Sequence, residues 1–136
     1  MYKEKTIPDL ESRSRIDERK LDYLFNQNIA PDFHNTSRAI QNAQQMQRLG
    51  LWNTPEAREL VREHLQQVVQ TPNNIVDRFT LPFADKSGTV GEVDTEVRES
   101  LLAGLSGKFA KLKSYWEVMP DGTRRFVSAE PYSARI

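Results

Sequence analysis

The C-terminal part of the chain alternates apolar and charged residues, and this period of two constrains the fold more than any other feature. Side chains of a β-strand point to opposite faces in turn, so residues 108–119 predict a strand with two chemically different faces. One face is apolar apart from a serine, and consists of Ala110, Leu112, Ser114, Trp116 and Val118. The other is charged and aromatic, and consists of Phe109, Lys111, Lys113, Tyr115 and Glu117. The turn residues Pro120-Asp121-Gly122-Thr123 then predict a hairpin into a strand over 124–131.

The residues before this hairpin recur at helical rather than strand spacing. In 54–70 the apolar side chains fall three or four positions apart, and Thr54 followed by Pro55 is typical of a helix start. Gly50 favours termination of an earlier helix. The sequence predicts helices over 16–25, 36–49 and 54–70, then strands over 75–82, 95–103, 108–119 and 124–131, with a loop near 84–91. Helices followed by strands predict an α+β fold, in which N-terminal helices pack on a curved antiparallel sheet.

A length of 136 residues and a hydrophobic content of 38% predict one domain with one core. We expect residues 1–15 to be a flexible lead-in and residues 16–136 to form the folded domain. No apolar run approaches the roughly 18 residues that suggest a membrane span, and the charged start lacks the apolar stretch of a secretory signal. The chain has no cysteine, which excludes disulfides and thiolate metal sites.

The net charge is zero, but the charges are unevenly distributed along the chain. Residues 75–97 hold two Lys or Arg against five Asp or Glu, whereas residues 98–136 hold seven against four. A protein that coats nucleic acid non-specifically would carry a positive excess overall, so this class is not favoured. The positive C-terminal part can still attract an anionic ligand locally.

The two histidines are candidates for proton transfer, because histidine titrates near neutral pH without help from its surroundings. His34 precedes a predicted helix among polar residues. It can act in catalysis or simply help to cap that helix, and the sequence leaves both open. His64 borders the apolar stripe of the 54–70 helix, and we interpret it as packed at the edge of the core.

Arg98 and Glu99 form a second candidate pair. Adjacent residues of a strand point to opposite faces, so Glu99 shares its face with Val97 and Leu101 rather than with Arg98. If that face is core, Glu99 is a buried carboxylate that must pair with a cation or have a raised pKa. If the face is solvated, Glu99 is an ordinary surface residue. The register of the strand decides between the two, and the sequence does not fix it.

The charged face of the 108–119 strand is the third candidate. Cations with an aromatic ring between them, as in Lys111, Lys113 and Tyr115, suit a chain of phosphates with bases to stack. The same pattern is typical of an ordinary solvated sheet face, and this alternative stays open. We interpret Trp116, on the opposite side, as a core residue. Weaker candidates for phosphate contacts are Ser114, Ser128 and Arg125.

Three segments carry a resemblance to a known family. These segments are HNTSRA at the start of a helix, GLWNTPEARELVREHLQQVV, and VRESLLAGLSGKFAKLKSYWEVMPDGTRRFVSAEPY. Together they resemble the C-terminal toxin domains of bacterial contact-dependent growth inhibition proteins, which are large and filamentous-haemagglutinin-like. The resemblance spans roughly residues 21–132. It implies the tip of a larger secreted or cell-surface effector, which acts in the cytoplasm of a target cell and is neutralised by a cognate immunity protein. Many such tips are metal-independent ribonucleases with a barnase/EndoU/colicin/RelE-like fold.

The resemblance therefore implies a ribonuclease, with tRNA among the RNA substrates to consider, that acts as a monomer without a metal or other cofactor. RNA cleavage of this kind needs a base, an acid and cations that stabilise the phosphorane. Our candidate catalytic residues are His34, Arg98, Glu99 and Lys111. Our candidate substrate-binding residues are Arg38, Lys113, Tyr115, Ser114, Ser128 and Arg125.

Two other functions remain open at this level. One is a toxin of another class, such as a metal-dependent DNase, and the other is a non-enzymatic domain whose sheet face binds a protein. The sequence lacks an HEXXH metal motif, a P-loop and the G-x-S-x-G motif of serine hydrolases. Those enzyme classes are therefore not favoured.

Overall fold

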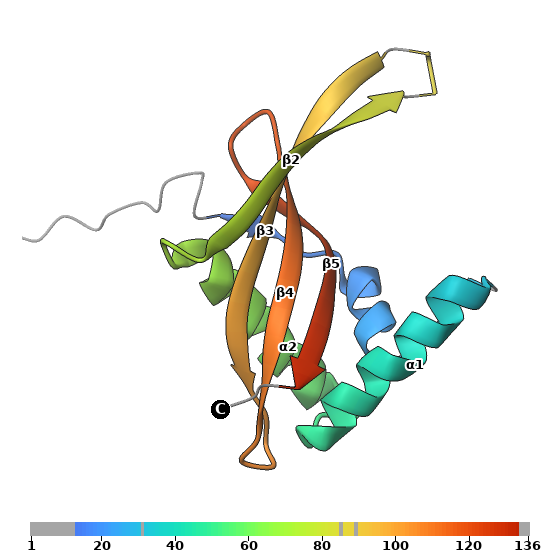
Figure 1. Ribbon diagram of the computed structural model, residues 1–136, viewed down its shortest axis with the longest axis vertical. Helices are drawn as coiled ribbons and strands as arrows, with labels where there is room; N and C mark the ends of the chain where they lie inside the picture. Colours follow the sequence, from blue (N-terminus) through green and yellow to red (C-terminus); the bar gives the residue numbers. More distant parts are fainter. Residues whose placement is uncertain (1–12, 31, 85, 89, 134–136) are drawn as a thin grey trace, which may run out of the picture.

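A computed structural model describes residues 13–30, 32–84, 86–88 and 90–133 of the chain. Two α-helices and a short 3₁₀ helix pack against a five-stranded, mostly antiparallel sheet (Figure 1). The elements in chain order are β1 Ser14–Arg15, η2 Glu18–Leu24, α1 Phe33–Arg48, α2 Pro55–Gln70, β2 Ile75–Ala84, β3 Val90–Ala103, β4 Phe109–Val118 and β5 Arg124–Ser133. The predicted α+β class is confirmed, and the two α-helices precede the four long strands as predicted, with the short strand β1 as an addition at the start.

The helix ends follow from their capping residues. Thr54 accepts a hydrogen bond from the backbone N–H of Ala57 at 3.1 Å, as the sequence predicts for the start of α2. The start of α1 lies three residues before the predicted position. The carboxylate of Asp32 accepts from the N–H groups of His34 and Asn35, which makes Asp32 the N-terminal cap. Gly50 ends α1 with a φ of 77°, a conformation that glycine adopts without strain.

The sheet order is β1-β5-β4-β3-β2, with β4 at its centre. Neighbouring strands from β2 to β5 run antiparallel, and β1 joins the edge of β5 in parallel. Ser14 and Arg15 therefore form a strand, and their assignment to a flexible lead-in is wrong. The rest of that prediction, for residues 1–12, lies outside the described part of the chain.

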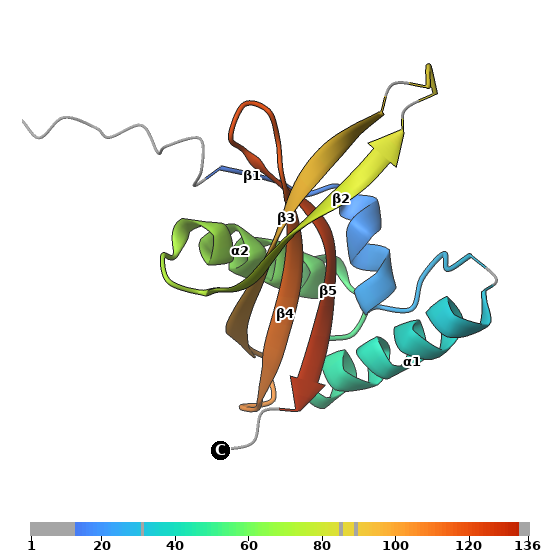
Figure 2. The same cartoon turned by 45° about the horizontal axis from the view of Figure 1, so that its top comes forward.

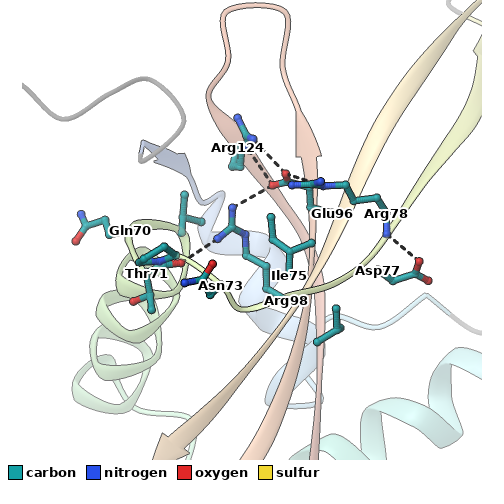
Figure 3. A pocket seen from close by; sticks show the side chains of 12 residues that line it. Gln70, Thr71, Asn73, Ile75, Asp77, Arg78, Glu96, Arg98 and Arg124 are labelled. Atoms are coloured by element: carbon teal, nitrogen blue, oxygen red, sulfur yellow. Dashed lines mark hydrogen bonds and ion pairs between the residues drawn. The ribbon is translucent and has the colours of Figure 1, made fainter.

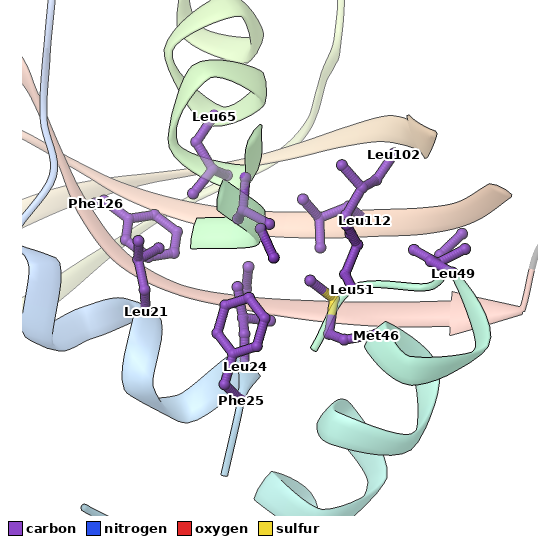
Figure 4. Packing of buried hydrophobic residues seen from close by; sticks show 14 of the residues in the cluster. Leu21, Leu24, Phe25, Met46, Leu49, Leu51, Leu65, Leu102, Leu112 and Phe126 are labelled. Carbon is purple, nitrogen blue, oxygen red and sulfur yellow. The ribbon is translucent and has the colours of Figure 1, made fainter. Parts of the chain in front are cut away.

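The core lies between the sheet and the helices, and α2 covers one face of the sheet (Figures 1 and 4). Trp116 of β4 is fully buried and packs against Phe126 of β5 with ring centroids 5.3 Å apart, which confirms Trp116 as a core residue. Burial of each large apolar side chain contributes about 1.5–3 kcal/mol. Other core residues that are fully or almost fully buried are Leu21, Leu24, Met46, Leu49, Leu51, Val61, Leu65, Leu102 and Leu112.

The end of α1 is attached to the loop between β3 and β4 by backbone contacts. The carbonyl of Leu49 accepts hydrogen bonds from the N–H groups of Leu105 and Ser106, at 2.7 and 3.0 Å. Gly104 makes this approach possible, because a Cβ atom at that position would lie 2.1 Å from the Leu49 oxygen. This glycine fixes how closely α1 can meet the sheet.

The outer parts of β2 and β3 leave the body of the molecule as a two-stranded arm (Figures 1 and 2). Apolar side chains on this arm are exposed, among them Leu81 and Val90. In the described part of the chain, no helix is long and apolar enough to cross a bilayer.

Candidate active site

The helix α2 lies on one side of the sheet (Figure 2), and the register places most of the predicted site residues on the face that points away from it. The register pairs Lys113 of β4 with Glu99 on one side and Glu130 on the other. We call this surface the open face. It comprises Glu99 and Leu101 of β3, Lys111, Lys113, Tyr115 and Glu117 of β4, and Arg125, Ser128, Glu130 and Tyr132 of β5.

A β-bulge in β5 determines which residues join this face. Tyr115 pairs with Ser128, but the next residue, Trp116, pairs with Phe126, so Val127 is an extra residue in β5. Before the bulge Phe126 points into the core, and after it Ser128 and Glu130 point to the open face. The extra residue therefore changes the parity of the strand and presents Glu130 to solvent.

Glu130 is the centre of a polar cluster at the edge of the open face. Its carboxylate lies 3.2 Å from the guanidinium of Arg38, which reaches over from α1, and accepts a hydrogen bond from the Tyr132 hydroxyl at 2.5 Å. The hydrogen bond to Glu130 and burial raise the pKa of Tyr132 to about 12. Burial and the charge of Glu130 also raise the pKa of Tyr115. Both hydroxyls therefore stay protonated at neutral pH and can donate hydrogen bonds. We call Arg38, Tyr115, Glu130 and Tyr132 the Glu130 cluster.

The cations of the open face differ in how they are paired. Lys111 forms an ion pair with Glu99 at 3.3 Å, and Arg125 forms one with Glu117 at 2.7 Å. Lys113 lies between two carboxylates in the register, yet within the described residues it forms no ion pair. Its ammonium group is thus available to an incoming phosphate.

Glu99 lies on the solvated side, which resolves the alternative that the sequence leaves open. Its side chain is 30% exposed, and its ion pair with Lys111 fixes the position of the lysine ammonium group. His34 occupies the exposed first turn of α1. Residues four apart on a helix are neighbours, with Cβ atoms about 5–6 Å apart, so His34 lies beside Arg38 at the border of the Glu130 cluster.

Arg98 lies on the opposite face of the sheet, and the prediction that it acts beside Glu99 and Lys111 is wrong in its geometry. Its guanidinium is 6% exposed and lies 3.1 Å from the carboxylate of Glu96. It also donates to the carbonyl oxygen of Val68 and to that of Thr71, the residue at the end of α2 (Figure 3 shows Thr71). Arg98 therefore ties α2 to β3 and does not reach the open face.

The same network includes Arg124, whose Nε lies 2.9 Å from Glu96, and the exposed Arg78 at 3.6 Å (Figure 3). Burial raises the pKa of Glu96, but the hydrogen bonds from Arg124 and Arg98 outweigh it and lower the pKa overall. A cavity of about 630 Å³ opens beside this network. These arginines are already ion-paired with Glu96. We therefore place the candidate site on the open face, where, among the described residues, Lys113 forms no ion pair with a carboxylate.

The prediction that Ser114 contacts a substrate is also wrong. Its side chain is fully buried and accepts a hydrogen bond from Trp116 Nε1 at 2.9 Å, so it satisfies the indole inside the core. His64 lies between α2 and β3, with Nε2 2.8 Å from Ser100 Oγ, as expected for a packed histidine. In the part of the chain that the structure describes, no three His, Asp or Glu side chains converge as a metal site requires.

Glu130 and Tyr132 belong to the candidate site, but no pattern in the sequence indicates them. Seven of the ten residues predicted from the sequence lie on the open face or contact it: Arg38, Glu99, Lys111, Lys113, Tyr115, Arg125 and Ser128. The alternation of side chains in β5 could have indicated Glu130 only if the bulge at Val127 were recognised.

Comparison with protein-family models finds no match, and comparison with curated proteins finds none either. Among solved structures, the chain is similar to a chain of a contact-dependent growth inhibition toxin–immunity protein complex from Klebsiella pneumoniae 342. The TM-score is 0.70 and the sequence identity 33%, over 92% of this chain and 98% of that chain. Such identity over nearly the whole of both chains indicates common descent as well as a common fold. The chain belongs to the family of contact-dependent growth inhibition toxin domains.

Proposed function

We propose that this toxin domain is a metal-independent endoribonuclease, and that the open face is its active site. The observation that carries the proposal is the Glu130 cluster beside the unpaired Lys113. It brings a carboxylate, a guanidinium, an ammonium group and two tyrosine hydroxyls to one solvent-accessible surface. These are the groups that cleavage of an RNA phosphodiester requires.

The reaction begins when a base removes the proton of a ribose 2′-hydroxyl. The 2′-oxygen then attacks the adjacent phosphorus, and the bond from phosphorus to the 5′-oxygen breaks. An acid gives one proton to the leaving 5′-oxygen, so one proton is taken and one is returned. The products are a 2′,3′-cyclic phosphate and a 5′-hydroxyl. Cations stabilise the additional negative charge of the phosphorane.

We assign these roles to side chains of the open face and its border. Glu130 is the base and His34, one helical turn from Arg38, is the acid. Arg38 and Lys113 stabilise the phosphorane. Lys111, held by Glu99, binds a neighbouring phosphate, and Tyr115 offers a ring on which a base can stack.

The substrate that fits this surface is RNA with unstacked nucleotides, and we propose tRNA as the first substrate to test. The open face carries four Lys or Arg, counting Arg38, against three Glu. This small excess attracts phosphates only over short distances, so it suits a folded RNA that presents a loop rather than a long duplex.

We also propose that a cognate immunity protein covers the open face or the His34 region. The Klebsiella protein was solved as a toxin–immunity protein complex, which supports a partner of this kind. Complementarity to Lys111, Lys113 and Arg125 would favour an acidic partner, whose association would slow as salt rises.

The proposal is tested by incubating the purified domain with total tRNA and with double- and single-stranded DNA, each with EDTA. We expect tRNA fragments that end in a 2′,3′-cyclic phosphate, and intact DNA. Cleavage of DNA that EDTA abolishes would indicate a metal-dependent DNase instead. Intact nucleic acids together with normal growth of bacteria that express the domain would indicate a non-enzymatic binding domain.

A further inference from the structure

A second cavity, of about 400 Å³, adjoins the Glu130 cluster. Its walls come from η2, the loop before α1, the first turn of α1 and the bulged part of β5. It shares Ser128 and Glu130 with the open face. The volume falls within the roughly 300–1,000 Å³ that small-ligand sites occupy.

The β5 bulge is part of this cavity. Val127, the extra residue, lies in its lining together with Ile29 and Ala30 of the loop. These three residues are the aliphatic part of a lining that is otherwise mostly polar, and aliphatic side chains are what the flat face of an aromatic ring contacts. The cavity therefore offers stacking to a planar ligand directly beside the candidate catalytic carboxylate.

The polar residues of the lining can form hydrogen bonds with the edge of such a ring. Asn28 and Asn35 each carry an amide that both donates and accepts, and Asp22 adds a carboxylate. Asn28 is held in place by a hydrogen bond from its Nδ2 to Asp22 at 3.3 Å. Within the described residues, the Asn35 amide side chain has no hydrogen-bond partner, so it is available to a ligand.

The loop that presents Asn28 has a defined conformation. Asn26 and Asn28 both adopt positive φ, at 53° and 50°, which asparagine tolerates better than other residues with a Cβ atom. The backbone carbonyl of Asp22 accepts from the N–H groups of Phe25 and Gln27, and the Asp22 carboxylate also holds Arg58 at 2.7 Å. The pocket is thus largely formed before a ligand arrives.

We infer that this cavity binds one unstacked nucleobase of the RNA and sets which base the domain selects at the cleavage site. The inference rests on the proposed ribonuclease function, because the ribose of a base held here would lie beside Glu130. Lys20 at the rim would then contact the backbone of the flanking nucleotide, whereas the neighbouring Arg19 is held by Asp17 at 2.9 Å. A base is favoured over an isolated phosphate because the lining combines amides with aliphatic side chains.

The pocket can be tested without any cleavage. The 3′-monophosphates of adenosine, guanosine, cytidine and uridine are titrated into the ¹⁵N-labelled full chain, and the side-chain amide signals of Asn28 and Asn35 are followed by NMR. We expect one nucleotide to bind at least about threefold more tightly than the others and to shift both amide signals. Asn35→Ala should weaken binding of the preferred nucleotide by roughly three- to tenfold, the contribution of one hydrogen bond, and so remove most of this preference.

Two further variants separate binding from folding. Gln47→Ala removes an exposed amide from the same helix outside the cavity, and should leave the preference unchanged. Asn28→Gly keeps the positive φ of the loop while it removes the amide, and should lower the preference as Asn35→Ala does.

Equal affinity for all four nucleotides, or shifts that spare Asn28 and Asn35, would overturn the inference even if the domain cleaves RNA. If the domain binds one nucleotide selectively but leaves RNA intact, the ribonuclease proposal is refuted, while the assignment of the cavity as a nucleobase-binding pocket is supported. The two failures are therefore distinguishable.

Discussion

The carboxylate of Glu130 in β5 lies 3.2 Å from the guanidinium of Arg38 in α1, so one ion pair joins the sheet to the helix at the candidate active site. Both side chains are partly exposed, at 22% and 33%. Such a pair contributes only about 0–1 kcal/mol to stability, which makes it more informative about function than about folding.

Glu130→Gln should lower the rate of RNA cleavage by roughly 10²–10⁴-fold, the usual contribution of a general base. The amide keeps the shape of the side chain but cannot take the 2′-hydroxyl proton. Single-turnover cleavage and thermal unfolding would be measured together. Glu63→Gln on the exposed face of α2 is the matched control, and should leave the rate unchanged. Wild-type activity in a folded Glu130→Gln variant would exclude this residue as the base.

His34→Ala should also lower the cleavage rate by roughly 10²–10⁴-fold if the imidazole is the acid. The backbone N–H of His34 donates to Asp32, and the substitution leaves that capping bond in place. Circular dichroism should therefore show an unchanged helix content. If instead the helix content falls in step with the activity, His34 is a capping residue and the acid must be sought among Tyr115 and Tyr132.

Lys113→Ala should weaken RNA binding and reduce the salt dependence of the affinity by about 0.7–0.9 in the log–log slope, since one phosphate contact is lost. Fluorescence anisotropy with a labelled RNA at several salt concentrations measures this slope. Lys108→Ala removes a charge from the exposed loop between β3 and β4 and serves as the comparison. The same slope in both variants would show that Lys113 contacts no phosphate.

Folding stability should fall in acid because of Glu96. Its arginine partners hold the pKa below the ordinary value of 4.5 in the folded state, in spite of burial. A carboxylate with a lowered pKa stabilises the fold fully above about pH 4.5, and this contribution is lost as the pH falls further. Urea unfolding at a series of pH values should show the loss.

Glu96→Gln removes the carboxylate from the same network. It should cost about 3–5 kcal/mol at neutral pH, because Arg98 is left buried without its counter-charge. The acid dependence should also become shallower than in the wild type. An unchanged acid dependence in this variant would mean that other carboxylates control acid unfolding.

Gly104→Ala should destabilise the domain by about 1–3 kcal/mol, because its Cβ would overlap the carbonyl of Leu49 and push α1 from the sheet. Gly107→Ala has open space around its Cβ but a φ of 82°, so it should cost about 1–2 kcal/mol through strain alone. The two variants are compared by urea unfolding. A smaller loss for Gly104→Ala than for Gly107→Ala would contradict the close contact.

The sequence predicts the parts of this molecule that local rules control. Period-two alternation correctly divides β4 into a core face and a charged face, and Thr54-Pro55 correctly starts α2. The errors arise where contacts between distant parts of the chain determine which way a side chain points. Arg98 lies on the covered face because of how β3 pairs with β4, and no local pattern fixes that register.

The missed site residues have a similar cause. From Phe126, which points inward, a regular strand would carry Ser128 and Glu130 into the core as well. The bulge at Val127 reverses this, and Glu130 then finds Arg38 on a helix that is distant in the sequence. Such a pairing depends on packing between α1 and β5, which composition and spacing do not reveal.

The projecting arm has little effect on the way a polyanion approaches this molecule. Its described residues carry charges of both signs, Arg78 and Lys86 beside Glu92 and Asp94, while Lys111 and Lys113 lie on the open face. At physiological salt the field of each charge decays over about 8 Å, so charges on the outer part of the arm change little of the attraction at the lysines. The way in which a polyanion meets the open face is therefore set by the charges that lie beside Lys111 and Lys113, and hardly by those of the arm.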